Sequence, residues 1–251
     1  MPATPAWPPK SAPRLFLEQE LGDGVNVTIQ GNAAHYLGKV MRVREDDAVI
    51  LCDNATGEWA ARVVEAGKRS VLLEVVERLR TREDVPDLWL CPALLKKDRF
   101  DFVLEKATEL GAGRIQPVLT RRCVADKLNW ERARTITIEA AEQCARTALP
   151  ELSEPAKLDA LLRDWPPDRA LFFADEEGGE PAHKTFTSSN GPCAILIGPE
   201  GGFDDAERTA IRAHPQARAI SLGPRILRGE TATVAALSVW MSLAGDWSDK
   251  E

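Results

Sequence analysis

The hydrophobic pattern of the chain changes character near residue 82. Before that point, β-rich stretches with many valines, leucines and isoleucines are separated by Gly, Asn and Asp turns. They cover residues 14–17, 25–29, 47–52, 58–64 and 71–76, with a hairpin turn over 53–57 and one helical stretch over 32–41. Five short strands so close together predict a small β-barrel.

After Pro86 the pattern is an alternation of apolar strands and longer helices. Strands are predicted at 88–95, 115–119, 170–173, 194–197 and 219–222, and helices at 98–110, 129–147, 204–214 and 230–243. Asp204, with Glu207 three residues later, is typical of an N-terminal helix cap. The alternation predicts an α/β domain with a mostly parallel sheet that is covered on both faces.

Three segments follow from this pattern. Residues 1–13 are rich in proline and are expected to form a flexible leader. Residues 14–82 are expected to form the small β domain, and residues 83–251 the α/β domain. The boundary is placed at the charged stretch that closes with Pro86.

Composition narrows the class of protein. The chain has 251 residues, of which 44% are hydrophobic and 28% charged, as in soluble globular proteins. No apolar run is long enough for a membrane span, and the leader lacks the apolar core of a signal peptide, so a cytoplasmic location is expected. The five cysteines are scattered, which predicts buried reduced thiols, with no disulfide framework and no metal site.

The net charge of −7 argues against a nucleic-acid partner at first sight. Binding depends on a local basic face, however, and several basic clusters interrupt the acidic background. They are Arg42 with Arg44, Lys96-Lys97 with Arg99, Arg121-Arg122, and Arg225 with Arg228. Taken singly, each cluster is better explained as an ordinary solvated surface.

Two loops late in the chain carry the candidate chemistry. Each follows an apolar strand: Gly198-Pro-Glu-Gly-Gly202 after the first, and Gly223-Pro-Arg-Ile-Leu-Arg-Gly-Glu-Thr231 after the second. Loops at the carboxyl ends of parallel strands bind ligands in α/β folds, so the pair predicts one pocket with two walls. No Gly-Lys-Ser/Thr follows, and no dinucleotide fingerprint is present, which disfavours a P-loop enzyme and a nucleotide-dependent oxidoreductase.

The charged residues of the second loop allow two interpretations. Arg228 and Glu230 can pair with each other or with Glu200, which would make them structural. Alternatively, Arg228 positions an anionic or polar substrate, and the helix that begins near Thr231 contributes backbone donors.

The two loops together resemble the signature of the RsmE family, which are SPOUT-class methyltransferases acting on N3 of a uridine in small-subunit (16S) ribosomal RNA. The resemblance rests on Gly198-Pro-Glu-Gly-Gly-Phe203 and on Leu222-Gly-x-Arg-Ile-Leu-Arg-x-Glu-Thr-Ala232. Similar blocks occur in order along the chain at residues 14–16, 35–42, 97–111, 117–123 and 139–146. Tyr36 and Gly229 depart from the residues most common in the family.

The resemblance implies a fold, a cofactor and partners. The α/β domain is expected to form a deep trefoil knot that holds S-adenosylmethionine. The protein is expected to be a homodimer, and the N-terminal domain to be a PUA-like barrel that binds RNA. The substrate would be 16S ribosomal RNA, with the assembled small subunit as the expected context. Neither a metal nor a membrane is implied.

The resemblance also implies roles for particular residues. Arg228 would stabilise negative charge on the uracil carbonyls, and Glu200 or Glu230 would accept the N3 proton. The cofactor would be held by Leu196, Ile197, Gly198, Glu200, Gly201, Gly202, Leu222, Gly223, Ile226, Leu227, Arg228, Thr231 and Ala232. The residues expected to bind RNA are Arg14, His35, Arg42, Arg44, Lys97, Arg121 and Arg122. A methyltransferase acting on another RNA, and a non-catalytic RNA-binding or assembly factor, remain the alternatives.

Overall fold

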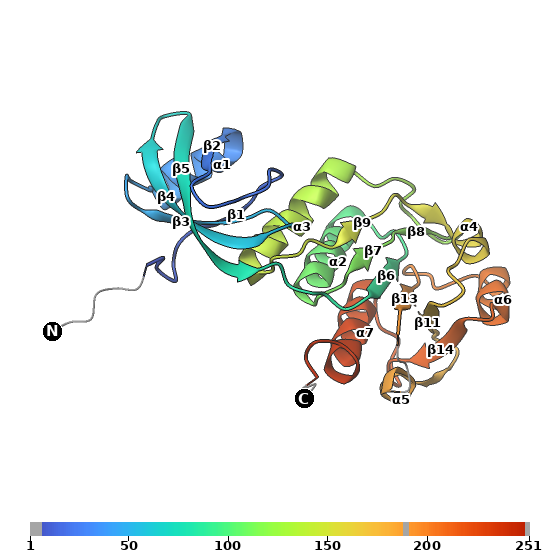
Figure 1. Ribbon diagram of the computed structural model, residues 1–251. Helices are drawn as coiled ribbons and strands as arrows, with labels where there is room; N and C mark the ends of the chain where they lie inside the picture. Colours follow the sequence, from blue (N-terminus) through green and yellow to red (C-terminus); the bar gives the residue numbers. More distant parts are fainter. Residues whose placement is uncertain (1–6, 188–190, 249–251) are drawn as a thin grey trace. The chain divides into compact units, whose positions relative to one another are not determined.

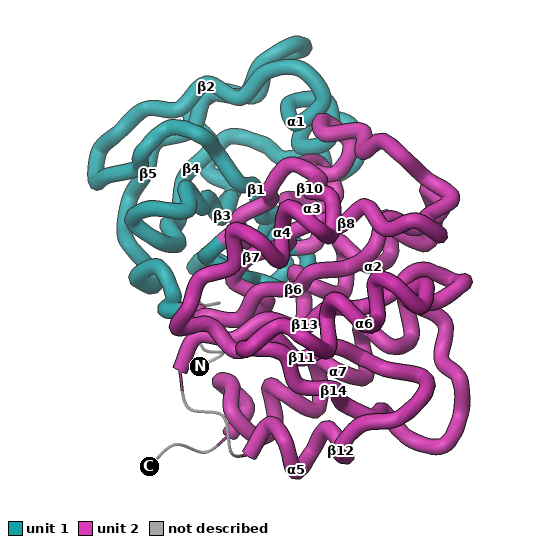
Figure 2. The backbone as a smooth tube through the Cα atoms, turned by 90° about the vertical axis from the view of Figure 1, so that its right-hand side faces the viewer, with its two compact units in different colours: residues 1–84, 141–148 teal, residues 85–140, 149–251 magenta. Residues whose placement is uncertain are grey.

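The computed structural model describes residues 7–187 and 191–248 (Figure 1). The first six residues of the expected leader therefore lie outside the described residues. The chain divides into two compact units (Figure 2). Unit 1 is Met1–Asp84 with Ala141–Ala148, and unit 2 is Val85–Ala140 with Leu149–Glu251. The sequence placed a single boundary near residue 82, and the return of residues 141–148 to unit 1 was not foreseen.

Unit 1 is built on a five-stranded sheet. Its strands are β1 (Arg14–Phe16), β2 (Asn26–Gln30), β3 (Ala48–Cys52), β4 (Gly57–Ala66) and β5 (Ser70–Thr81), in the order β1-β3-β4-β5-β2. β1 pairs with β3 in parallel, and the other pairs are antiparallel. The five predicted strands are confirmed. The predicted helix over 32–41 is also present, as a short α1 (Gly31–His35) continued by a π-helical segment, η1 (Tyr36–Met41).

Residues 141–148 belong to unit 1 because their polar groups are bonded there. The backbone N–H of Phe16 donates to Glu142 Oε1 at 2.7 Å. Glu83 Oε1 in turn accepts from the N–H groups of Thr147 and Ala148, at 2.6 and 3.0 Å. These contacts join residues distant in sequence, so no local pattern predicts them.

Unit 2 contains a seven-stranded sheet in which all neighbouring strands run parallel to each other. The order is β12-β14-β11-β13-β6-β7-β9, from β6 (Leu88–Pro92), β7 (Arg114–Ile115), β9 (Glu151–Leu152), β11 (Ala170–Ala174), β12 (Glu180–Pro181), β13 (Cys193–Ile197) and β14 (Ala217–Ser221). A small second sheet pairs β8 (Val118–Leu119) with β10 (Ala156–Lys157). The prediction of a mostly parallel sheet is confirmed.

Helices cover both faces of this sheet, as its central strand shows. In β13, Cys193, Ile195 and Ile197 pack into one core cluster, and Ala194 and Leu196 pack into another. The first cluster includes side chains of α2 (Lys97–Glu109), α5 (Ala182–Thr187) and α7 (Gly229–Leu243). The second includes side chains of α4 (Leu158–Arg163) and α6 (Asp205–Ala213). Helix α3 (Trp130–Cys144) is as long as α7, and its last residues, from 141 on, are assigned to unit 1.

Two sequence expectations need correction. The strand expected over 115–119 is divided between β7 and β8, which lie in different sheets; Pro117 stands at the break and has no N–H for a ladder. The cysteines are free, but Cys144 is exposed at the end of α3 and Cys123 is only half-buried. Cys52, Cys91 and Cys193 are buried, and burial raises the pKa of each thiol to about 12.

In the part of the chain that the structure describes, no helix has the length and apolar character needed to cross a bilayer. No group of three side chains there could hold a metal ion.

Candidate functional site

A cavity of about 240 Å³ lies at the carboxyl ends of β11, β13 and β14 in unit 2. Three loops line it, over residues 174–178, 197–203 and 220–227, together with Arg208 of α6 and with Gly229 and Ala232 of α7. The predicted pocket between the second and third of these loops is confirmed. The first loop, which follows β11, is a further wall that the sequence did not indicate.

Glycines let the backbone approach closely around the cavity. Gly202 and Gly223 have φ angles of +66° and +115°, which residues other than glycine rarely adopt. A Cβ at Gly202 would also overlap the carboxylate of Glu176. A Cβ at Gly229 would lie 3.3 Å from the carbonyl oxygen of Gly198 and 3.2 Å from Leu95. This tight contact explains why Gly229 suits this chain where the resemblance led us to expect Ala.

The structure divides the predicted cofactor residues into two groups. Those that line the cavity are Ile197, Gly198, Gly202, Leu222, Gly223, Ile226, Leu227 and Ala232. Five others do not: Leu196, whose side chain is buried in the core, and Glu200, Gly201, Arg228 and Thr231. Arg228 and Thr231 are exposed at the start of α7, where Arg228 occupies the N-cap position.

The two candidate carboxylates, Glu200 and Glu230, share one cation. Arg99 on α2 lies 3.1 Å from Glu200, Nη1 to Oε1, and 3.8 Å from Glu230, Nε to Oε1. The expected alternative, in which Arg228 pairs with either glutamate, is not found among the described residues. Glu230 Oε2 is buried and has no hydrogen-bond partner there. Arg99 belongs to a recognised sequence block, but nothing local indicated that it reaches both loops.

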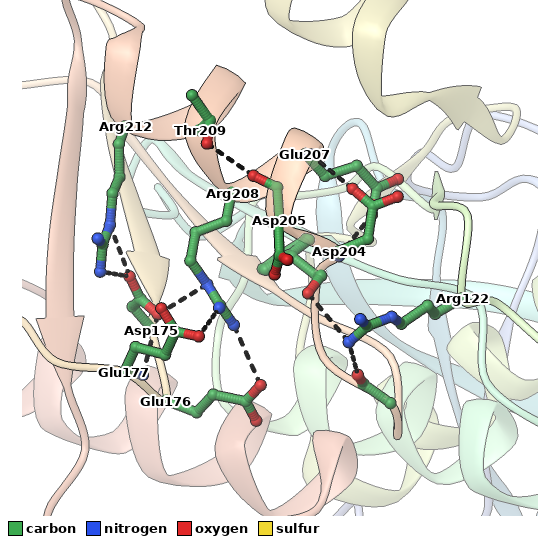
Figure 3. A network of polar contacts seen from close by, with 12 residues as sticks. Arg122, Asp175, Glu176, Glu177, Asp204, Asp205, Glu207, Arg208, Thr209 and Arg212 are labelled. Atoms are coloured by element: carbon green, nitrogen blue, oxygen red, sulfur yellow. Dashed lines mark hydrogen bonds and ion pairs between the residues drawn. The ribbon is translucent and has the colours of Figure 1, made fainter.

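A second charged cluster joins the loop after β11 to α6 (Figure 3), and Asp175, Glu176 and Arg208 of this cluster line the cavity. Arg208 of α6 lies 3.3 Å from Asp175 (Nε to Oδ1) and 3.1 Å from Glu176 (Nη2 to Oε1), and it also pairs with Glu177. Arg212, one turn later, contacts Asp175 Oδ2 at 2.6 Å. The Asp-Glu-Glu run directly after the predicted strand 170–173 was the available signal.

Comparison with known proteins shows the family. A model of the RNA methyltransferase domain matches residues 82–241, and a model of the RNA methyltransferase PUA domain matches residues 29–76. Ribosomal RNA small subunit methyltransferase E of Bacillus subtilis is 30% identical, over 90% of this chain and 94% of that protein. The chain belongs to the ribosomal RNA small subunit methyltransferase E family.

Two solved structures agree with this membership. A methyltransferase of Legionella pneumophila, in complex with the bound cofactor SAM, has a TM-score of 0.84 and 29% identity, covering 94% of this chain and 99% of that one. A ribosomal RNA small subunit methyltransferase E of Neisseria gonorrhoeae, bound to S-adenosyl methionine, has a TM-score of 0.84 and 27% identity, covering 94% and 100%.

In this member of the family, two predicted RNA-binding arginines also support the loop that carries Gly198–Gly202. Arg122 Nη1 donates to the carbonyl oxygen of Gly201 at 2.7 Å. Arg121 Nη1 lies 3.0 Å from Asp204 Oδ2, and its backbone N–H donates to Glu207 Oε1. The predicted capping box of Asp204 and Glu207 is confirmed, so these contacts hold the start of α6. Both arginines remain exposed, as does Lys97.

In unit 1, the predicted RNA-binding residues fall into two environments. Arg14 is mostly buried and lies 2.9 Å from Glu58, Nη2 to Oε2, while Arg80 contacts the same oxygen at 2.6 Å. Arg14 is therefore already engaged in an ion pair, in which it shares the Glu58 carboxylate with Arg80. His35, Arg42 and Arg44 are exposed around α1 and η1.

Proposed function

We propose that this protein is an S-adenosylmethionine-dependent methyltransferase that methylates N3 of a uridine in 16S ribosomal RNA. The observation that carries the proposal is the cavity at the carboxyl ends of β11, β13 and β14, which is built from the two family loops. Relatives that match over most of their length carry the corresponding name, and two solved relatives are bound to S-adenosyl methionine.

The residues around the cavity fit this cofactor. Ile197, Ile220, Leu222 and Leu227 give an apolar surface for an adenine ring. The backbone at Gly202 and Gly223 gives close access for polar groups, and Glu176 and Arg225 bring charges of both signs to the rim. When bound, S-adenosylmethionine supplies an activated methyl group on a sulfonium centre. We assign it to the cavity-lining residues, with Leu196, Glu200, Gly201, Arg228 and Thr231 contributing through the adjoining backbone.

The protein then has two tasks, positioning and proton removal. Holding the uracil in line with the methyl group replaces a bimolecular encounter by a fixed geometry. Because a neutral imide is a poor nucleophile, its N3 proton must pass to a base. Glu230 and Glu200 are the candidates, and Arg99 keeps both carboxylates in place. Arg228 would stabilise the negative charge that develops on the uracil carbonyls.

RNA binding is assigned to exposed basic groups on each unit. These are His35, Arg42 and Arg44 in unit 1, and Lys97, Arg121 and Arg122 in unit 2. Arg14 is the weakest of the predicted contacts, because it already pairs with Glu58. N3 of a paired uridine is blocked, so the target base must be unpaired or flipped out. Because these basic groups would neutralise RNA phosphates, the affinity for RNA should fall steeply as the salt concentration rises.

Three further features belong to the proposal. A deep trefoil knot is supported by the contact of Gly229, the first residue of α7, with the carbonyl of Gly198. A homodimer is supported by the exposed hydrophobic side chains Phe102 on α2 and Leu243 on α7. We also assign residues 14–82 as the RNA-binding domain and 83–251 as the catalytic domain, acting on the small subunit in the cytoplasm.

The proposal is tested by calorimetric titration of the purified protein with S-adenosylmethionine, with NADH as the control ligand. We expect saturable binding of S-adenosylmethionine alone. Absence of S-adenosylmethionine binding, both without RNA and with small-subunit RNA present, would contradict the enzyme assignment and favour a non-catalytic RNA-binding factor.

A further inference from the structure

Three carboxylates pair with Arg208, and Glu176 is the one of them that packs directly against the loop that carries Gly198–Gly202. It follows β11 and lines the cavity, and its carboxylate fills the position that a Cβ would take at Gly202. Its neighbour Glu177 does not line the cavity. The two glutamates are thus adjacent in sequence and share one arginine, but differ in whether they face the cavity.

Arg208 fixes the orientation of Glu176. The Arg208 side chain is only 7% exposed, and its Nη2 lies 3.1 Å from Glu176 Oε1. Arg208 is held in turn by Asp175, which is 1% exposed and also contacts Arg212 (Figure 3). Since both anchors are buried, the position of the Glu176 carboxylate is set before any ligand arrives. A pre-set acceptor avoids part of the ordering cost of binding.

The environment of Glu176 selects the kind of group it can bind. A carboxylate only accepts hydrogen bonds, and the second oxygen, Oε2, has no hydrogen-bond partner among the described residues. The guanidinium of Arg208 is shared among Asp175, Glu176 and Glu177; it contacts Oε1 of Glu176 and leaves Oε2 free to accept from a donor. Vicinal hydroxyl groups match two carboxylate oxygens, as with the acidic residue that binds a ribose in dinucleotide-binding folds.

We propose that Glu176, positioned by Arg208, accepts hydrogen bonds from the ribose hydroxyl groups of the cofactor and so makes the site selective for a ribonucleoside. The inference rests on the proposed function, because it takes the cofactor to be an adenosine derivative. In dinucleotide-binding folds the acidic residue follows the glycine loop in sequence. Here it precedes the loop, in the turn after a different strand, β11, and reaches the loop only in the folded chain.

The test compares Glu176→Ala with Glu177→Ala in calorimetric titrations. Two probes are used: S-adenosylmethionine, and 5′-deoxy-5′-methylthioadenosine, which keeps the ribose but lacks the sulfonium and the amino-acid tail. We expect Glu176→Ala to weaken both probes by about 10- to 100-fold, the loss of hydrogen bonds to a charged group. Glu177→Ala should bind both as the wild type does, and equal melting temperatures of the two variants would show that folding is intact.

The outcomes separate this inference from the proposed function. If Glu176→Ala weakens S-adenosylmethionine but not methylthioadenosine, the carboxylate binds the cationic tail and the ribose assignment is wrong. If neither probe is weakened although the wild type binds both, the inference fails and the proposed function stands. If the wild type binds neither probe with or without RNA, the proposed function itself fails.

Discussion

Arg99 and Glu230 lie 3.8 Å apart, Nε to Oε1, and the same guanidinium lies 3.1 Å from Glu200. These three residues come from α2, from the loop after β13 and from α7, so one side chain connects both family loops to a third element. Removing a shared cation leaves two carboxylates close together without compensation, and their mutual repulsion moves them apart. The arrangement of both candidate bases therefore depends on Arg99.

Replacing Arg99 should slow methyl transfer without abolishing cofactor binding. We expect Arg99→Ala to lower the single-turnover rate by about 10- to 100-fold, the range typical of losing acid–base positioning. S-adenosylmethionine affinity should stay near that of the wild type, because Arg99 does not line the cavity. Arg99→Lys should recover part of the rate, since a point charge replaces a planar fork. Arg132→Ala, which breaks the separate surface pair with Asp101, is the matched control and should leave the rate unchanged.

The two candidate bases can be separated by replacing each with glutamine. Glu230 is favoured because its buried Oε2 has no partner among the described residues and because its neighbour Gly229 lines the cavity. Glu230→Gln should therefore reduce the rate by about 100-fold and remove the rise of rate with pH, whereas Glu200→Gln should keep a wild-type profile. Rate–pH profiles of the methyl-transfer step decide the matter. Unchanged profiles in both variants would exclude both residues as the base.

Gly202→Ala should impair cofactor binding by displacing Glu176. The substitution carries two costs: backbone strain at a φ of +66°, and overlap of the new Cβ with the Glu176 carboxylate. Gly24→Ala is a matched control, because Gly24 has a φ of +73° and open space around it but lies in unit 1. Both variants should lose about 1 kcal/mol of stability from strain. Calorimetry should show weaker S-adenosylmethionine binding in Gly202→Ala alone; equal affinities would contradict the assigned role of the loop.

Glu58 should make unit 1 sensitive to acid. Burial acts to raise the pKa of Glu58, but hydrogen bonds from Arg80 and Arg14 outweigh it and hold the pKa below its ordinary value of 4.5. A lowered pKa means that the ionised form stabilises the fold above about pH 4.5, and that this contribution is lost as the pH falls further. Glu58→Gln should cost about 3 kcal/mol at neutral pH and show less loss of stability on acidification.

Thermal unfolding between pH 3 and 7 checks this prediction. Glu65→Gln, an exposed position on the same strand β4, is the control and should follow the wild-type curve. A Glu58→Gln curve that stays parallel to the wild type below pH 4.5 would mean that Glu58 does not provide the acid sensitivity.

Local sequence patterns predicted most of the fold and two of the three loops that line the cavity. Strand and helix periodicity located the long elements, and the Asp204–Glu207 spacing located the start of α6. Five short elements that were not predicted, β9, β10, β12, α4 and α5, have between two and six residues and leave too little pattern to detect. The signature loops indicated a pocket because they follow apolar strands, which is a local property.

What the sequence did not reveal are contacts between distant segments. The wall formed by Asp175 and Glu176 became visible only when β11 was placed between β13 and β14. The pairing of Arg99 with Glu200 and Glu230 depends on the packing of α2 and α7 against one face of the sheet. A charge that will be paired and a charge that will stay in solvent look alike in sequence, so the pairing of Arg14 with Glu58 was not foreseen.

The central claim is tested most directly by transfer of a labelled methyl group from S-adenosylmethionine to small-subunit ribosomal RNA, followed by mass spectrometry of the digested nucleosides. Assembled small subunits and naked RNA should both be offered, from cells that lack the modification. We predict one labelled N3-methyluridine per RNA, and none with the Arg228→Ala variant. Label on another nucleoside or another RNA would contradict the proposed specificity, and no label on either substrate would contradict the proposed activity.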